Sequence, residues 1–504
     1  MSSSSPRLLA PPKAPYTPMV SDTGIIETLE ARQAGRQITS DREEPSYSML
    51  SLQERMKAQT SFPPFEVKLA LIDLYFTHCH NNPYSLFHER QFRHNFHSGH
   101  LKNHLLLAVM ASAARFADVA MLGRDALEMA VYFADCAWQT ASLDCFSGSM
   151  DTDIITVQTI TLLSLFDFTG QFTNYTASRW IFSHEFTAGP EKHNSAWVKI
   201  GLAVRLAQDL HLMEEPDATL PVSEKEEHRR TFWSIYLLER LVSCGRRRPP
   251  AILDGSFLLQ LPCNEQAWYS NLEEQTPTLN DFCNHRIPEN QNFGPFAMVI
   301  MAASLLSRCA QYALQKQPIG SDEPPWHPKS GHVAIVSSMM FLEEQLQLGE
   351  PLEVLLHKYA FSNGVLDNSL SAPLIFSRLL YHLCRCLLYH PFLLREQTIS
   401  SRDNIPNVFW SHSKNTCLEA SDEIIKLVQQ ASEVGCTPNS CFSGYCVTIA
   451  ATVQALQTTG EIVLGISLAA ERLQKCIEHL DMLGKHWHSA TVMVSQSISI
   501  LLFT

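Results

Sequence analysis

Apolar residues recur every three or four positions in many separate stretches of this chain, and no series of alternating apolar and polar residues separated by tight turns is found. That period predicts amphipathic helices. The stretches lack a fixed repeat length, which argues against the standard solenoid repeats. We therefore predict an all-α fold, a large irregular multi-helix array, with helices at 66–79, 105–117, 124–143, 151–166, 296–315, 332–348, 374–394, 417–432, 441–457 and 468–487.

The clearest pattern begins at Trp197, where a first helix is predicted. Its buried face is expected to carry the apolar residues at three-to-four spacing, with Arg205 and Asp209 beside them. A second helix is expected to start at Ser223, because Ser223 and Glu226 have the spacing of a capping box. The apolar residues predicted for the buried face of the first helix are Val198, Leu202, Leu206 and Leu210.

The second helix has an apolar face and a polar face in the sequence pattern. We predict that Arg229, Arg230 and Glu239 lie mostly on the face opposite the apolar residues. Gly245 suits the end of this helix, and Pro249-Pro250 prevent it from continuing. The apolar face is predicted to consist of Phe232, Ile235, Tyr236, Leu238 and Leu241.

Taken in order, the run from Trp197 to Cys263 resembles the core of the fungal-specific transcription factor domain, the middle homology region of zinc-cluster regulators. It reads W-V-K-I-G-L-A-V-R-L-A-Q-D-L-H-L, then S-E-K-E-E-H-R-R-T-F-W-S-I-Y-L-L-E-R-L, then C-G-R-R-R-P-P-A-I-L-D. The segment 71–92 and the helix ending in Tyr-His-Pro-Phe near Pro391 resemble other parts of the same domain. The family-motif residues, to which we assign structural roles, are Trp197, Arg205, Gln208, Asp209, Arg230, Trp233, Arg248, Pro249 and Pro250.

The chain divides into two parts by composition. Residues 1–60 are rich in serine, proline and isolated charges and are predicted to be disordered. Residues 61–495 are assigned to the regulatory (middle homology) domain. The stretch 171–194 lacks helical periodicity, and both a long surface loop and an error in the gene model remain open explanations.

The charge balance changes the functional expectation. The 504 residues include 51 acidic and 38 basic side chains, a formal net charge of -13. Affinity for DNA depends largely on Lys and Arg contacts to phosphates, so this balance argues against a chain that holds DNA by itself. No apolar run reaches the length of a membrane span, and the first residues lack the apolar core of a secretory signal.

Metal chemistry is expected to be absent. In the resembled family, six cysteines near the N-terminus hold two zinc ions and position a DNA-reading helix. Their pattern is C-x2-C-x6-C, a variable loop, then C-x2-C and a last cysteine. This chain has no cysteine before Cys79, so we expect neither a zinc cofactor nor autonomous zinc-dependent DNA binding. Four other groupings are better explained as helix or core residues than as ligands: His78-Cys79-His80, Cys384 and Cys386, Cys436 with Cys441 and Cys446, and His486 with His488.

Two local features leave alternatives open. The triplet Arg246-Arg247-Arg248 is interpreted first as part of a structural turn, with a nuclear import signal or an anion contact as alternatives. The aromatic residues Trp197, Trp233 and Tyr236 are interpreted as core rather than as the lining of a cavity. No catalytic motif of known spacing occurs, so we do not expect an enzyme.

The resemblance implies a nuclear regulator of transcription, specific to one pathway and suited to a gene cluster of secondary metabolism. It implies other transcription factors or co-regulators as partners, DNA contact only indirectly or through a missing module, a small-molecule effector and no membrane. The alternatives are a helical adaptor or co-regulator that binds a related factor, and a helical enzyme.

Overall fold

A computed structural model describes residues 63–123, 125–146, 153–170, 192–244, 249–288, 291–314, 323–362, 364–398, 405–436, 440–458, 463–487, 489–491 and 493. The segments predicted to be disordered (1–60) and to form a loop (171–191 of 171–194) lie outside these residues. The first half of the fold consists of α3 (Phe65–His78), α4 (Glu89–His97), α5 (Asn103–Ala113), a 3-10 turn (Ala114–Phe116), α6 (Val119–Leu122), α7 (Ala126–Phe146), α8 (Ile154–Gly170), α9 (Lys192–Asp209) and α10 (Val222–Ser243).

The second half is also helical, which confirms the all-α prediction. Its elements are α11 (Glu265–Tyr269), α12 (Leu279–Cys283), α13 (Pro295–Leu314), α14 (Gly331–Gln345), α15 (Leu352–Tyr359), β1 (Phe361–Ser362), β2 (Val365–Leu366), α16 (Asn368–Leu388), α17 (Pro391–Thr398), α18 (Asn407–Glu433), α19 (Cys441–Thr458) and α20 (Val463–Gly484).

The structure differs from the predicted helices in several places. The short helices α4, α6, α11, α12 and α15 were not predicted, and β1 and β2, of two residues each, form an antiparallel hairpin. The predicted helix 374–394 is two helices, because α16 ends at Leu388 and Pro391 opens α17. Proline fits the first position of a helix, where its missing N–H group has no partner to lose.

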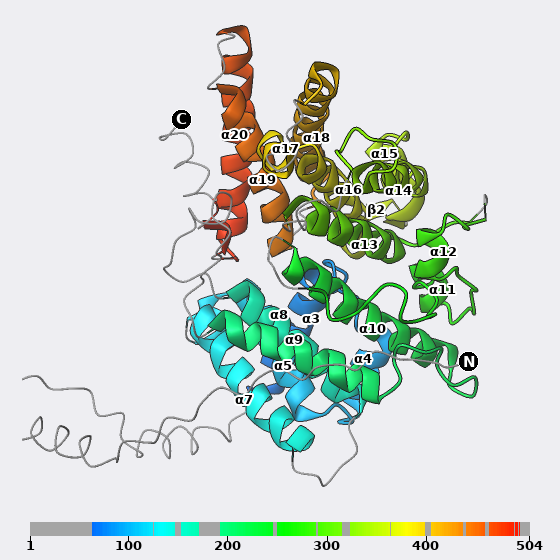
Figure 1. Cartoon of the computed structure of the whole chain (residues 1–504). Coiled ribbons are helices and arrows are strands. Elements are labelled where there is room, and N and C mark those ends of the chain that lie inside the picture. The colour runs from blue at the N-terminus through cyan, green and yellow to red at the C-terminus, as the bar shows by residue number, and fades with distance from the viewer. Residues whose placement is uncertain are drawn as a thin grey trace, which may run out of the picture. The chain divides into compact units, whose positions relative to one another are not determined.

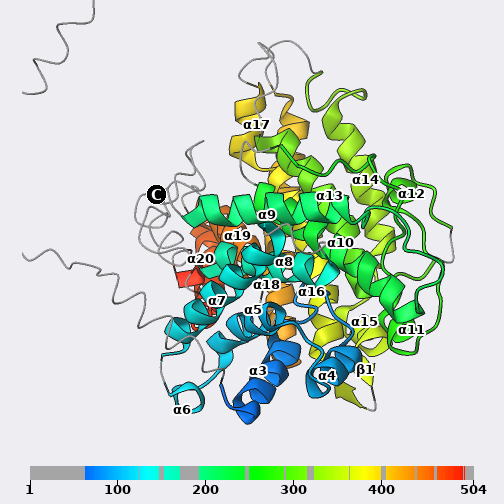
Figure 2. The same cartoon turned by 90° about the horizontal axis from the view of Figure 1, so that it is seen from below.

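The N-terminal helices pack around α5. Helix α5 contacts α3, α7 and α8, and every one of its residues after Asn103 is buried. Small side chains such as Ala108, Ala111 and Ala113, each at most 1% exposed, let the neighbouring helices approach closely. In Figure 1, α5, α7, α8 and α9 lie at the bottom, and Figure 2 shows the same group from below.

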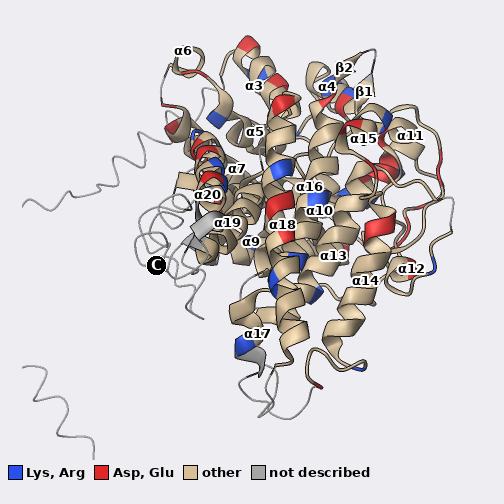
Figure 3. Ribbon diagram, turned by 90° about the horizontal axis from the view of Figure 1, so that it is seen from above, with Lys and Arg blue, Asp and Glu red and all other residues tan. Residues whose placement is uncertain are grey.

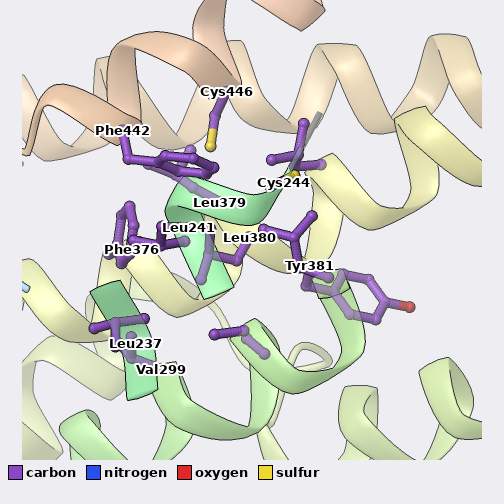
Figure 4. Packing of buried hydrophobic residues seen from close by; sticks show 14 of the residues in the cluster. Leu237, Leu241, Cys244, Val299, Phe376, Leu379, Leu380, Tyr381, Phe442 and Cys446 are labelled. Atoms are coloured by element: carbon purple, nitrogen blue, oxygen red, sulfur yellow. The ribbon is translucent and has the colours of Figure 1, made fainter. Parts of the chain in front are cut away.

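A second and larger core joins the middle of the chain to its C-terminal part. Leu237 and Leu241 of α10 meet Val299 of α13 and residues of α16 and α19, as Figure 4 shows. Helices α13 and α16 pack along each other, and α16 also contacts α18 and α19. Segments more than 200 positions apart in the sequence therefore share one hydrophobic core.

Helix α13 is the one described helix long and apolar enough to cross a bilayer, with a mean hydropathy of 1.4 over its window. In the fold, 78% of that window is buried inside the protein, against α10, α14 and α16. A helix that is apolar on all sides is expected at the centre of a large core. Its composition is therefore explained by packing.

Charged side chains of both signs are interspersed along α18 and α20, as Figure 3 shows. Lys426 pairs with Glu423 at 2.6 Å, and Lys475 pairs with Glu471 at 2.8 Å. Arg472 of α20 reaches Asp422 of α18 at 2.8 Å. This surface differs from the one-sign basic stripe that phosphate backbones require.

Candidate functional site

Helix α9 buries a different face from the predicted one. Val198 is 64% exposed, and Leu202, Leu206 and Leu210 are only half-buried. The buried face consists of small and β-branched residues that pack against α8 and α10. Its members are Ala196, Ile200, Ala203, Val204 and Ala207.

Helix α10 begins one residue earlier than predicted. Val222 is its first residue, Pro221 occupies the N-cap, and no side chain caps the helix. The predicted capping box is therefore wrong: Glu226 instead accepts hydrogen bonds from Arg230 Nε at 2.8 Å and from the backbone N–H of Cys263 at 3.0 Å. From Arg230 to Ser243 every residue of α10 is buried, so the predicted polar face for Arg230 and Glu239 is also wrong.

The first polar group on α10 is the Arg230 cluster, which we define as Ser85, Glu226, Arg230, Cys263 and Glu265. The guanidinium donates to Ser85 Oγ at 2.8 Å, to the carbonyl of Cys263 at 2.8 Å and to Glu265 Oε1 at 3.3 Å. It also stacks over the ring of Trp268, 4.2 Å from the centroid. One side chain thus ties α10 to the turn before α4 and to the start of α11.

Electrostatics keep the guanidinium of Arg230 charged despite its burial. Burial alone lowers the pKa of Arg230, but the carboxylates of Glu265 and Glu226 outweigh that effect and raise it above its ordinary value. Burial raises the pKa of Glu265, and Arg230 opposes that rise. Removing one member would leave an uncompensated buried charge, which is strongly destabilising.

The second polar group, the Arg240 cluster, consists of Tyr236, Glu239, Arg240, Asp254 and Ser304. Arg240 donates to Glu239 Oε2 at 3.0 Å and to Asp254 Oδ1 at 2.6 Å, and the Tyr236 hydroxyl donates to the same Asp254 oxygen at 2.7 Å. Ser304 of α13 donates to Asp254 Oδ2 at 2.8 Å. The cluster therefore fixes the segment after α10 between α10 and α13.

Aromatic residues between the two clusters complete the core of α10. Trp233 is fully buried, and its Nε1–H donates to the carbonyl of Gln260 at 2.8 Å. Its ring meets Tyr236 and Phe257 edge-on, with centroids 5.4 and 5.5 Å away. Trp233 and Tyr236 are core residues, and neither lines the pocket described next.

A pocket of about 220 Å³ lies where α4, α5, α8 and the start of α10 meet. Its apolar lining comes from Phe87, Phe92, Leu101, Leu105, Ile154 and Ile155. Its polar lining comes from Gln91, Asn95, Gln158, Glu224, Glu227 and His228. This combination of an apolar wall and a few convergent polar groups is typical of a small-molecule site.

Glu227 is an acid of the pocket wall with a shifted pKa. Burial raises its pKa to about 7, with a further rise from Glu224, although hydrogen bonds from Gln158 and the His88 backbone oppose it. Gln158 Nε2 donates to Glu227 Oε1 at 3.0 Å, and the N–H of His88 donates to Oε2 at 3.3 Å. The carboxyl group is thus held in one orientation at the pocket wall.

The remaining residues of the family motif lie at or near the surface, or outside the residues that the structure describes. Arg205 and Asp209 are exposed, and Arg205 donates to the side chain of Gln208 at 2.8 Å. Trp197 is half-buried against the main core. Pro249 is exposed and Pro250 half-buried, whereas Arg248 lies outside the described residues, as does the rest of the 245–248 stretch.

Sequence reasoning missed the residues that complete the two clusters. Asp254 is the last residue of A-I-L-D in the family motif, so its position after the Pro-Pro turn could have indicated a role for it. Glu265 follows L-P-C-N and had no such signal, because its partner Arg230 is 35 positions away. The pocket residues Gln158 and Glu227 come from two separate predicted helices, and nothing in the sequence indicated that they meet.

A family comparison identifies the chain's relatives. A family described as the fungal specific transcription factor domain matches residues 72–348. That range includes α10, both polar clusters and the pocket.

Individual relatives extend the similarity beyond the family match. A Zn(2)-C6 fungal-type transcription factor, FTF1c, of Fusarium oxysporum f. sp. lycopersici is 23% identical over 447 residues, which cover 85% of this chain and 44% of that protein. FTF2 of the same organism is also 23% identical, over 85% of this chain and 39% of its own length. An uncharacterized transcriptional regulatory protein of Schizosaccharomyces pombe is 23% identical over 88% of this chain and 53% of its own length. The chain thus spans less than half the length of the two Fusarium relatives.

The cysteines of this chain do not fit the zinc cluster of such relatives. No two of the 14 cysteines are three positions apart, as C-x2-C requires, and all 14 are free. Burial raises the pKa of Cys244 to about 12, so this thiol stays protonated and is a poor zinc ligand. Within the described ranges, no group of three His, Cys, Asp or Glu side chains could hold a metal ion.

Proposed function

This chain belongs to the fungal specific transcription factor domain family, and we propose that it is a nuclear regulator of transcription that acts through its helical array. The observation that carries the proposal is the family match over 72–348, which spans the buried helix α10 with both of its polar clusters. The similarity to transcription regulators of two fungi over 85% or more of the chain supports it.

We propose that DNA contact is indirect for these residues, through a partner or a module outside this sequence. The net charge of -13 and the missing six-cysteine spacing support this arrangement. The partners are then other transcription factors or co-regulators. We further propose that the protein serves one pathway, such as a cluster of metabolite genes, and uses no zinc of its own.

The regulatory mechanism we propose is a shift between conformations of the array. Packed helices joined by specific polar clusters have discrete arrangements, and a partner or ligand that prefers one of them changes its population. The regulatory domain is proposed to run to about residue 495, because α16, α18 and α19 share the core of α10 and α13. The chain is assigned no catalytic activity.

A tethering experiment tests the regulatory role. The full chain, fused to a heterologous DNA-binding domain, is expected to change the output of a reporter gene that carries the matching operator. Chromatin immunoprecipitation of the tagged native protein is expected to enrich a limited set of promoters, while the purified protein alone does not bind their DNA. The DNA-binding domain without the chain is the control.

The outcomes separate this proposal from the co-regulator alternative. A chain that leaves the reporter unchanged, is absent from promoters and stays in the cytosol overturns the regulator proposal. A chain that is absent from promoters but co-purifies with a zinc-cluster factor supports a sequestering co-regulator instead.

A further inference from the structure

The pocket between α4, α5, α8 and α10 has the size of a small organic ligand. A cavity of about 150 Å³ with apolar walls accommodates benzene. The 220 Å³ available here therefore fits a six-membered ring or a six-carbon chain with one short polar substituent. Phe87, Phe92 and Leu105 are buried residues of its wall and supply the surface against which such a body packs.

The polar side of the pocket has one sign of charge. Glu224 and Glu227 both contribute to the lining, and the lining includes no lysine and no arginine. Among the described contacts, Glu227 receives hydrogen bonds only from uncharged donors, and the carboxylate of Glu224 has neither a hydrogen bond nor an ion pair. A ligand cation would supply the positive partner that the protein does not.

The carboxylate of Glu227 is positioned by a connected set of contacts. Gln158 is 1% exposed, and its amide nitrogen also lies 3.2 Å from the carbonyl of Leu86 and 3.2 Å from the hydroxyl of Thr231. The backbone N–H of His88 holds the second oxygen of Glu227. The acceptor is therefore oriented before any ligand arrives, which lowers the entropic cost of binding.

From this geometry we infer that the pocket binds a small organic amine, with its apolar body against Phe87, Phe92 and Leu105 and its ammonium group on Glu227 and Glu224. An ammonium group donates up to three charge-assisted hydrogen bonds, which suits two carboxylates and the nearby amide oxygens. An anionic ligand would meet two carboxylates and no lysine or arginine in this lining. Burial lowers the pKa of His228, so this imidazole is neutral where Glu227 ionises, and repulsion excludes the anion.

The groups that face Glu227 make binding depend on pH. These are Glu224 and His228 of α10 and His88 at the N-cap of α4, and Arg90 of α4 acts on His88. Burial lowers the pKa of His228 and His88, so both imidazoles are neutral where Glu227 ionises. Raising the pH through about 7 therefore makes the pocket more negative and strengthens its attraction for an amine.

The pocket is also connected to the Arg230 cluster through neighbouring residues of α10. Glu227 follows Glu226 in α10, and Gln158 contacts Thr231, the residue after Arg230. An amine that reorients Glu227 would act on the same turn of α10. This regulatory consequence rests on the proposed function, whereas ligand binding by the purified protein does not.

The test is calorimetric titration of the purified full chain with three probes that share a phenylethyl group: phenethylamine, 2-phenylethanol and 3-phenylpropionate. Phenethylamine is expected to bind at about pH 8 at least about tenfold more tightly than the alcohol, and the acid is expected not to bind. Lowering the pH to about 6 is expected to weaken amine binding several-fold. A second readout is the rise in melting temperature with amine concentration.

Two variants and a control separate the pocket from other binding. Glu227→Gln removes the charge and is expected to weaken the amine about tenfold. Asn95→Trp, at a half-buried position of the lining on α4, is expected to fill the pocket and abolish binding while the fold remains. Glu353→Gln, at an exposed position of α15, is the matched control and is expected to leave binding unchanged.

Amine and alcohol binding equally well, or no heat with any probe at millimolar concentration, overturns the inference. Full amine affinity in Asn95→Trp also overturns it, because the amine would then bind elsewhere, and this variant decides the matter if Glu227→Gln does not fold. The tethered reporter is independent of these titrations. An unmodified chain that binds no amine but keeps an active reporter therefore refutes the pocket and not the regulatory function.

Discussion

One guanidinium nitrogen of Arg240 lies 2.6 Å from Oδ1 of Asp254, across 14 positions of sequence. The same carboxylate accepts hydrogen bonds from Tyr236 of α10 and Ser304 of α13. A single acidic side chain therefore closes the connection after α10 and holds it against two helices. In the sequence, Asp254 follows the Arg-Arg-Arg-Pro-Pro run of the family motif.

Replacing Asp254 by asparagine is expected to destabilise the protein by about 2 kcal/mol, because Arg240 loses one of its two charged partners. The measurement is the free energy of unfolding from urea titration. Asp209→Asn, at an exposed position of α9, is the matched control and is expected to stay within about 0.5 kcal/mol of the parent. Equal effects of the two substitutions would contradict the anchoring role of Asp254.

Replacing Arg230 by methionine is expected to cost about 3–5 kcal/mol, because Glu226 and Glu265 are left as unpaired buried charges. Combining this change with Glu226→Gln and Glu265→Gln is expected to recover part of the loss, since the charges are then removed together. Arg205→Met is the control, at an exposed position of the same motif. A triple variant less stable than Arg230→Met alone would show that the charges are not coupled.

The stability of the fold is expected to depend on pH through Glu227. Its folded pKa of about 7 exceeds the ordinary value of 4.5, so the folded protein keeps a proton that the unfolded chain releases between these values. The contribution of Glu227 is therefore present at about pH 5 and is lost as the pH rises through 7. The wild-type protein should exceed Glu227→Gln in stability by more at pH 5 than at pH 8, and a constant difference would refute this assignment.

Buried histidines are expected to act with the opposite sign. Burial lowers the pKa of His390 and of His479 to about 4, below the ordinary 6.5, so the unfolded chain takes up protons that the folded protein refuses. Stability is thus expected to fall as the pH drops from about 6.5 towards 4. His390→Gln should flatten that slope in urea titrations, and the exposed control His94→Gln should not. An unchanged slope in His390→Gln would mean that this imidazole is protonated in the fold.

Much of the architecture was predictable, because helix formation depends on local periodicity. The helices around Leu105, Met301 and Leu379 were all expected from their apolar spacing, and each is buried in the fold. The short helix α12 was missed although Thr278 and Asp281 form a real capping box. Five residues are too few for a hydrophobic period to show.

The burial of individual faces was harder to predict. Val198 was assigned to the core of α9 and is exposed, whereas Ala203 and Ala207 are buried. Alanine adds little to an apolar pattern, yet its small side chain lets helices approach, so packing selected the face with the smaller residues. The rule that large apolar residues lie inside fails where two helices must come close.

The sequence by itself determined the helical class of this protein and its family, because both depend on residue order within short stretches, above all the run from Trp197 to Cys263. Only the tertiary structure decided that Arg230 and Arg240 are core residues and that Glu227 faces a pocket. A charge can be buried only where partners compensate it, and those partners, such as Ser85, Asp254 and Glu265, come from segments that the fold alone brings together.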